Sequence, residues 1–444
     1  MEQIQPNSEP DFAAFVAIDW ADTEHVWSLQ PGSDQRREHG RVDHTPESVE
    51  VWITSLIARF HHQPIAIAIE QCRGALVFML SKYAELHLYP IHPRAAAQFR
   101  SALFPSGAKD DPADADLLLD MLLLHRAHLR RLDPDTEQTR SLQMLVEERR
   151  RMVNENTRQS NRLTARLKLY FPQVLEWFDE VDSPLVGAFL QRWPTLEAVQ
   201  RVRPKTLRQF FYSHNCRNHE RIELRLQQMR DAIPATRDKA VICSSTASVG
   251  VMVQIIQTLR NGITSLDNEI ETIVKAHPDF AIFDSLPGAG KVMVPRLIAA
   301  MGSRRDRFSS AAEVQSYSGI APVLQQSGKS RWVHFRWACP KFVRQTFHEW
   351  AGHSIPWSDW ARACYDQQRQ RGKGHHAAVR TLAFKWIRIL YRCWQDHTPY
   401  LAEQYEAARG NRLQARTTSP AASDDLQLVW KSCAGFSKLT RLSH

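Results

Sequence analysis

The chain has 444 residues, enough for two or three domains, and its 43% hydrophobic and 24% charged composition is ordinary for a soluble protein. No apolar run approaches the length of a membrane span, and residues 1–11 are polar and acidic, unlike a secretory signal. The seven cysteines are scattered singly, without a Cys-x-x-Cys pair. We therefore expect a cytosolic protein with reduced thiols, no membrane span and no secretory leader.

Two carboxylates follow short apolar runs near the start of the chain. Asp19 comes directly after the run 15–18, and Glu70 comes directly after the run 65–69. Short apolar runs of this kind are typical of buried strands. Single acids at strand ends are common in proteins, so these two residues point to a site only in company with other acids.

Two further carboxylates, Asp111 and Asp114, stand just before the apolar stretch 117–124. Their i,i+3 spacing places both on one face of a helix. The same residues make a good helix start, because Asp111 can cap the helix, Pro112 fits its first position and Asp114 suits the helix dipole. Alone, this pair is explained better by a helix cap than by a metal site.

Taken together, the four acids predict a metal site. Two acids at strand ends and two on a helix could meet on one side of a sheet, where carboxylates repel one another unless a cation lies among them. Oxygen-rich sites of this kind suit Mg²⁺ or Mn²⁺. Paired ions of this type carry out phosphoryl transfer on nucleic acids.

A second possible metal site is weaker. His214, Cys216 and His219 are close enough in sequence to suggest zinc. No fourth ligand is evident and the surrounding residues are polar, so the pattern predicts a surface turn instead.

The net charge of +9 is unevenly distributed. Residues 329–393 hold 13 Lys and Arg against 3 Asp and Glu, a local charge of +10 that leaves about −1 for the remainder. The same stretch holds six tryptophans: Trp332, Trp337, Trp350, Trp357, Trp360 and Trp386. A basic segment with interleaved aromatic residues is typical of nucleic-acid contact, and the alternative is a helical core with a basic outer face. We expect both features here.

The first part of the chain, residues 12–130, alternates strands with helices. Strands are expected at 15–18, 25–29, 65–69 and 87–91, and helices at 46–60, 74–86 and 112–128, the first of them opened by Thr45 as its cap. This alternation predicts an α/β domain, a sheet with helices on its faces.

The middle part, residues 135–276, is expected to be almost wholly helical. Its clearest pattern is an apolar a/d heptad over nearly four repeats: Val249, Met252, Ile256, Leu259, Ile263, Leu266, Ile270 and Ile273. The heptad predicts a coiled coil, either within one chain or between chains, although one helix of an intramolecular bundle has the same spacing.

The last part, residues 279–408, is expected to be mostly helical. It begins with a Leu-Pro-Gly-Ala-Gly stretch ahead of the apolar helix 292–301. Gly288 and Gly290 would let backbone N–H groups face a phosphate, as in a helix-hairpin-helix element, although Pro-Gly-x-Gly also makes plain turns. No Walker lysine–serine pair is present, so nucleotide hydrolysis is not predicted. Residues 409–444 are expected to form a flexible tail.

One serine, Ser327, stands between polar residues ahead of the basic segment. A serine can attack a phosphodiester when a metal or base activates it and cations hold the phosphate. Ser-Gly alone predicts only a turn. The candidate nucleic-acid-binding residues are the two glycines together with Lys329, Arg331, Arg336, Lys341, Arg344, Arg380 and Lys385.

Over roughly residues 12–408 the chain resembles the DEDD transposases of bacterial insertion sequences, the IS110 (IS-one-ten) family. The resemblance implies a RuvC-like, ribonuclease-H-type domain with its four acidic positions at Asp19, Glu70, Asp111 and Asp114. It implies a coiled-coil middle and a C-terminal transposase domain with its nucleophilic serine at Ser327. The sequence departs from the family where many members carry a Ser-Lys-x-Gly-like stretch, here 335–341, and in its extra length beyond residue 350.

The resemblance also implies a mechanism and partners. Mg²⁺, or Mn²⁺, held by the four acids would polarise a DNA phosphate, and the serine would attack it to give a DNA-phosphoserine intermediate. Further implications are a structured bridge RNA encoded by the element, DNA at the element ends and the target, a homo-oligomer through the coiled coil, and a nucleoid-associated location in a bacterial cytoplasm. Two alternatives remain: a RuvC-like nuclease that uses metal-activated water, and an inactive nucleic-acid-binding assembly protein.

Overall fold

The computed structural model describes residues 10–70, 72–103, 111–328 and 330–403, although the side chains of residues 111 and 112 are outside the description. The chain divides into two compact units after Pro134. Each unit is described by itself below. The expected tail at 409–444 lies outside the described residues.

The first unit is built on a mixed five-stranded sheet with the order β3-β2-β1-β4-β5. The first three strands form an antiparallel meander, and β1, β4 and β5 are parallel. The strands are β1 (Ala14–Asp19), β2 (Glu24–Pro31), β3 (Glu38–Asp43), β4 (Ile65–Ile69) and β5 (Leu86–Pro90). The sheet and its helices confirm the expected α/β domain and are consistent with a RuvC-like fold.

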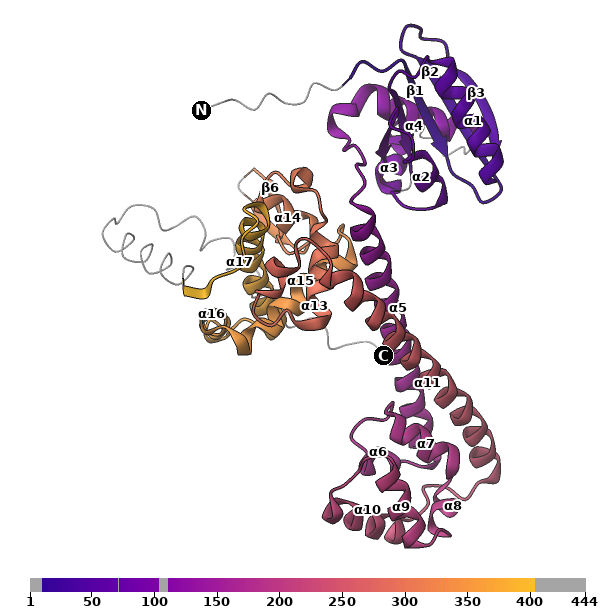
Figure 1. Ribbon diagram of the computed structural model, residues 1–444, viewed down its shortest axis with the longest axis vertical. Helices are drawn as coiled ribbons and strands as arrows, with labels where there is room; N and C mark the ends of the chain where they lie inside the picture. The colour runs from indigo at the N-terminus through magenta and orange to yellow at the C-terminus, as the bar shows by residue number, and fades with distance from the viewer. Residues whose placement is uncertain (1–9, 71, 104–110, 329, 404–444) are drawn as a thin grey trace, which may run out of the picture. The chain divides into compact units, whose positions relative to one another are not determined.

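Helices cover both faces of this sheet (Figure 1). They are α1 (Pro46–Arg59), α2 (Ala75–Leu80), α3 (Pro93–Leu103), α4 (Asp111–His125) and the short 3₁₀ helix η1 (Arg126–His128). The strand β4 reads Ile-Ala-Ile-Ala-Ile, and its alternation separates the two cores. The isoleucines of β4 join the core under α1 and α2, while Ala66 and Ala68 join the core under α4. The small alanines leave room for α4 to pack closely on the centre of the sheet.

Most elements of this unit match the sequence expectations. Thr45 caps α1 by accepting a hydrogen bond from the Ser48 N–H, as predicted. Two elements were not predicted: β3, whose sequence is polar because the strand lies at the sheet edge, and α3, whose alanines give little periodic signal. The helix α2 is shorter than expected, since the chain after Leu80 turns into β5.

The second unit contains two long helices that pack against each other (Figure 1). These are α5 (Glu137–Tyr170) and α11 (Lys239–Lys275). Five short helices gather at one end of the pair around an aromatic core: α6 (Val174–Trp177), α7 (Pro184–Arg192), α8 (Leu196–Gln200), α9 (Pro204–Ser213) and α10 (His219–Asp231). The core at the other end belongs to the C-terminal elements.

The C-terminal elements are again mostly helical, as expected. They are α12 (Phe280–Asp284), α13 (Gly290–Met301), η2 (Arg305–Arg307), α14 (Ala311–Tyr317), the hairpin of β6 (Val323–Ser327) and β7 (Ser330–His334), α15 (Lys341–Ser354), η3 (Ile355–Trp357), α16 (Asp359–Gln370) and α17 (His375–Gln395). Their separation from the long helices into a domain of their own stays a prediction.

The predicted heptad lies on α11 and packs along α5. Its ends are buried in the two cores, while Leu259, Ile263 and Leu266 near the middle are half-buried. Gly262 faces Met152 of α5, and a Cβ atom there would come within 2.7 Å of the methionine Cε. The methionine methyl is the end of a flexible side chain, so a small residue here would require only that Met152 shift. Whether this pair forms a coiled coil with another copy of the chain stays a prediction.

Among the described residues, α11 is also the one helix long and apolar enough to cross a membrane, by length and composition alone. It meets this criterion on average hydropathy, and its apolar runs, such as 249–253, are far shorter than a membrane span. Core helices of soluble proteins pass the same test. Here Val249, Met252, Val253, Ile256, Ile270 and Val274 of α11 belong to the two protein cores.

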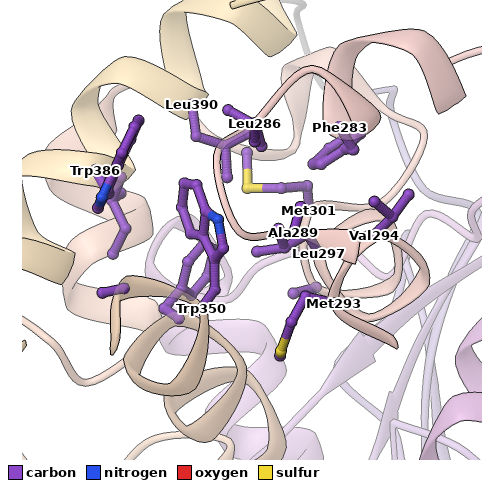
Figure 2. Packing of buried hydrophobic residues seen from close by; sticks show 14 of the residues in the cluster. Phe283, Leu286, Ala289, Met293, Val294, Leu297, Met301, Trp350, Trp386 and Leu390 are labelled. Atoms are coloured by element: carbon purple, nitrogen blue, oxygen red, sulfur yellow. The ribbon is translucent and has the colours of Figure 1, made fainter. Parts of the chain in front are cut away.

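The residues beyond Trp350 complete the C-terminal core and are not an appendage. Figure 2 shows Trp350 and Trp386 close together beside α13, and their ring centroids are 5.0 Å apart. Both indoles are fully buried and hydrogen-bonded: Trp350 Nε1 donates to the Pro287 carbonyl at 3.1 Å and Trp386 Nε1 donates to Ser354 Oγ at 2.7 Å. Buried indole N–H groups need such partners, so α17 is required for the fold.

Candidate nucleic-acid active site

Two of the four predicted acids lie side by side at one edge of the sheet. The parallel strands β1 and β4 are in register with Ile18 opposite Ile69. Asp19 and Glu70 follow these residues directly, so both acids stand where the two strands end, and both are half-buried. Adjacent parallel strands place their carboxyl ends at the same edge of the sheet, which is the usual location of α/β sites.

The helix α4 approaches the same edge with its N-terminus. Near its C-terminal end, the Arg126 guanidinium lies 5.0 Å from the ring of Phe12, just before β1 begins. Near its N-terminal end, Asp116 accepts a hydrogen bond from Ser28, which pairs with Ala17 towards the end of β1. The helix therefore runs antiparallel to β1, and its first turn is directed towards the strand ends.

Asp114 belongs to this first turn and is 8% exposed. It forms an ion pair with Arg100 of α3. Asp111 begins α4, but its side chain lies outside the described part of the structure. A carboxylate this buried requires a cation nearby, which Arg100 supplies here and which a metal ion could also supply.

The structure does not gather the acids into a finished metal site. Among the described side chains, no group of three or more His, Cys, Asp or Glu residues could hold an ion. The donor set nevertheless fits a hard cation, because it consists of carboxylate oxygens, at two strand ends and on a helix directed towards them. His214 lies in a surface turn, as predicted, with its Nδ1 2.9 Å from the Phe210 carbonyl oxygen.

Two acids that the sequence analysis did not single out fix the position of α4. Asp116 accepts a hydrogen bond of 2.6 Å from the fully buried Ser28 and lies 3.0 Å from His39 Nε2. Asp120 forms an ion pair with Arg37. These contacts hold α4 on β2 and β3, and thereby position Asp114. The signal available in the sequence was the spacing of Asp116 and Asp120, which places both acids on one helix face.

A histidine pair holds the turn that follows Asp19. His25 is fully buried, and its Nε2 lies 2.8 Å from His44 Nδ1. The Ala21 N–H donates to His25 Nδ1 at 3.3 Å. Burial lowers the pKa of His25 to about 4, with a further contribution from the facing His44. The imidazole of His25 is therefore neutral at pH 7 and can accept this hydrogen bond.

In the second unit, Ser327 lies at the tip of an antiparallel hairpin formed by β6 and β7, which we call the serine hairpin (Val323–His334). Ser327 pairs with Ser330, and both side chains are exposed. Gly328 in the two-residue turn has φ +55°, a left-handed conformation that favours glycine. Lys329, the other turn residue, lies outside the described residues. The sequence predicted the turn but not the strands.

The predicted basic residues gather mostly behind this hairpin. The guanidinium groups of Arg344 and Arg380 lie 4.9 Å and 4.5 Å from the ring of Phe335, the residue that follows β7. Arg336 donates from Nε to the Ala321 carbonyl at 3.4 Å. Lys341 is exposed at the start of α15. These residues place positive charge at the base of the serine hairpin.

Two of the basic candidates are placed differently. Arg331 is exposed on β7 and pairs with Gln326, on the face of the hairpin away from Ser327. Lys385 of α17 lies with its Nζ 3.1 Å from Cys364 Sγ of α16, so it belongs to the α16–α17 contact. Within the described part of the chain, none of Arg331, Arg336 and Arg344 forms an ion pair with a carboxylate, which leaves their charge available to a ligand.

The two predicted glycines have different roles. Gly288 has φ +70°, and a Cβ atom there would come within 2.5 Å of the His353 carbonyl oxygen, so this glycine allows the loop before α13 to pack against α15. Gly290 has φ +51° and faces open space at the first residue of α13. Only Gly290 is thus placed to expose backbone N–H groups, and phosphate binding at this loop stays a prediction.

Comparisons with known proteins match two parts of the chain to families of transposases. A family model described as DEDD transposase IS110 matches residues 16–172, and a model described as transposase IS116/IS110/IS902 family matches residues 281–366. A protein of Streptomyces coelicolor named as the mini-circle transposase for IS117 is 24% identical over 397 residues, which cover 87% of this chain and 95% of the relative. An IS110 insertion-element protein of the same organism is also 24% identical, covering 88% and 96%.

A shorter match concerns a different kind of protein. A pilin gene-inverting protein of Moraxella bovis is 35% identical over 74 residues, which cover 16% of this chain and 23% of the relative. The two family models together match more than half of the chain. The first match includes the four acids, and the second includes Ser327. The chain therefore belongs to the IS110 family of DEDD transposases.

Proposed function

We propose that this transposase cleaves and rejoins DNA strands through a covalent serine–phosphate intermediate formed by Ser327. The observation that carries the proposal is the position of Ser327, exposed at the tip of a hairpin with Arg336, Arg344 and Arg380 at its base. A nucleophile for a DNA phosphate needs access to the strand and positive charge held nearby, and Ser327 has both. The pilin gene-inverting relative supports recombination as the reaction class.

The charge of the surrounding sequence supports the same substrate. Residues 314–348 contain five Lys and Arg and no Asp or Glu. The segment around Ser327 therefore has no carboxylate that would repel a phosphate. Such a stretch attracts the DNA backbone through an electrostatic contribution that is independent of base sequence.

The proposed reaction conserves phosphodiester bonds. The Ser327 oxygen attacks phosphorus and its proton passes to a base or to water, while the bond from phosphorus to the 3′ oxygen breaks and that oxygen takes up a proton from water. This leaves a phosphoserine ester on one DNA end and a free 3′-hydroxyl on the other. A 3′-hydroxyl from a partner strand then attacks the ester and releases the serine, so that no high-energy cofactor is consumed.

We propose that Asp19, Glu70, Asp111 and Asp114 bind Mg²⁺, or Mn²⁺, in the first unit. When bound, the metal would supply Lewis-acid polarisation of a phosphate oxygen and neutralise developing charge. The four carboxylates would contribute the oxygen ligands. In the structure, the carboxylate of Asp114 forms an ion pair with Arg100. Asp116 and Asp120 position the helix that carries two of the acids.

The proposal extends to partners. By family resemblance, the DNA substrates are the ends of an insertion element and a target site, and a structured RNA from the element guides their choice. The chain would act as a homo-oligomer. The long helices α5 and α11 support this last point, since Leu259, Ile263 and Leu266 are only half-buried within one copy.

The decisive experiment is a search for a covalent protein–DNA adduct. Nicked suicide DNA carrying the element's ends is incubated with the full-length protein, Mg²⁺ and the element's flanking RNA. We expect an adduct that resists denaturation and disappears in Ser327→Ala. The matched control is Ser330→Ala, because Ser330 pairs directly with Ser327 and is equally exposed. It should keep the adduct.

A different result would identify a different enzyme. Cleavage without any adduct, unaffected by Ser327→Ala, would contradict the serine intermediate and establish a RuvC-like nuclease that uses activated water. An adduct that survives in Ser327→Ala but is lost in Ser330→Ala would identify Ser330 as the nucleophile.

A further inference from the structure

An exposed tryptophan accompanies the serine on the serine hairpin. Trp332 of β7 is 50% exposed and belongs to none of the hydrophobic cores among the described residues. A large aromatic side chain left half in water on a two-stranded ribbon contributes little to folding. Its position therefore calls for another explanation.

Strand register places Trp332 on the same face of the hairpin as Ser327. Ser327 pairs with Ser330, and Gln325 pairs with Trp332. Residues that are directly opposite share a face, and side chains on one face recur every second residue. Trp332 is thus the diagonal neighbour of Ser327, and such neighbours lie about 7–8 Å apart.

The charge around this face specifies the class of ligand. Residues 314–348, which include the hairpin, hold five Lys and Arg and no Asp or Glu. Arg344 and Arg380 are held against the ring of Phe335 at its base. An aromatic surface set among fixed cations is typical of proteins that bind single-stranded nucleic acid, where bases stack on the rings and phosphates lie near the cations.

We propose that Trp332 stacks on an unpaired nucleobase close to the phosphate that Ser327 attacks. This inference rests on the proposed function and names the form of its substrate. A base inside a continuous duplex has both faces covered by its neighbours, so it offers no face to the indole. The ligand is therefore a strand that is unpaired beside the cleavage position, and Trp332 is a positioning residue.

The test measures binding in the full-length Ser327→Ala protein, which cannot cleave through this serine. The probe is a mixed-sequence DNA oligonucleotide with 2-aminopurine at successive positions, used alone and annealed to its complement. We expect quenched fluorescence of the single strand and tighter binding of the single strand than of the duplex. Trp332→Ala should weaken single-strand binding about tenfold, within the range for loss of one stacked base, and leave duplex binding nearly unchanged.

Two further variants make the result specific. Trp332→Phe keeps a ring and should restore most of the single-strand affinity. Trp357→Ala is the matched control, because Trp357 is 73% exposed but lies in η3, outside the hairpin. Its affinity for the single strand should equal that of the parent.

Equal single-strand binding by Trp332→Ala and its parent, in protein with an unchanged circular dichroism spectrum, would overturn the inference. So would an equal loss of affinity for single strand and duplex. The measurement reports binding by a protein that lacks Ser327, so its result does not depend on the covalent adduct. Failure of the serine intermediate and failure of base stacking are therefore distinguishable.

Discussion

Asp114 is the predicted acid whose surroundings are best defined. It is nearly buried, and Arg100 is its ionic partner. A buried carboxylate that forms an ion pair with a residue of a neighbouring helix either stabilises the fold or serves as a metal ligand. The two roles differ in what a neutral side chain of the same shape would do.

We expect Asp114→Asn to abolish strand cleavage, by roughly 100-fold or more, while leaving DNA binding nearly intact, because a neutral amide is a poor ligand for Mg²⁺. Glu47→Gln is the control and should keep cleavage, since Glu47 is an exposed acid on α1 of the same unit. Cleavage of labelled DNA and its binding by fluorescence anisotropy measure the two effects. A variant that loses binding or melts at a much lower temperature would favour the structural role.

At the scale of elements, the β1–β2 turn depends on an uncharged histidine. Burial, and then the facing His44, lower the pKa of His25 from 6.5 to about 4. The unfolded chain binds a proton at His25 below about pH 6.5, whereas the folded chain does so only near pH 4. The unfolded state thus holds more protons in this window, and stability falls as the pH falls from 6.5 towards 4.

Thermal melting of the first unit should therefore show a melting temperature that falls across this pH window. In His25→Gln the fall should be smaller, since the amide does not titrate and can still hydrogen-bond to the Ala21 N–H. The comparison is the slope of melting temperature against pH in the two proteins. Identical slopes would show that protonation of His25 does not cause the fall in melting temperature.

The long helices carry a second prediction at this scale. The heptad of α11 contacts α5 within one chain, so the apolar surface left for another copy includes Val251 and Ile255, which are 57% and 37% exposed. We expect Val251→Glu with Ile255→Glu to shift the proposed homo-oligomer towards monomer, while the fold is retained because neither residue is in a core. Sedimentation velocity measures the change. An unaltered oligomer would exclude this face as the interface.

At the scale of the whole molecule, each unit holds one part of the proposed chemistry. The first unit contributes acids at the edge of a mixed sheet, and the second contributes an exposed serine among fixed cations. The extra length beyond Trp350 belongs to the second unit as part of its core, because Trp386 packs on Trp350. Truncation before α17 would therefore expose a large apolar surface instead of removing a separate module.

Much of this organisation was readable from the sequence because it depends on local periodicity. The apolar runs ending at Asp19 and Glu70, the heptad of α11 and the Thr45 cap are all patterns within a few residues, and each appears as predicted. The four acids, the serine and the basic segment were likewise identified by residue type and order. Their assignment to a metal and to a covalent intermediate remains to be tested by the experiments above.

The tertiary structure alone decided how these local patterns meet. The antiparallel course of α4 along β1, the contacts of Asp116 with Ser28 and the pairing of Arg100 with Asp114 join residues far apart in the chain. The register that places Trp332 on the face of Ser327 depends on strand pairing, which a polar sequence does not reveal. Sequence periodicity specifies which side of an element is apolar, whereas long-range packing and pairing determine which element that side contacts.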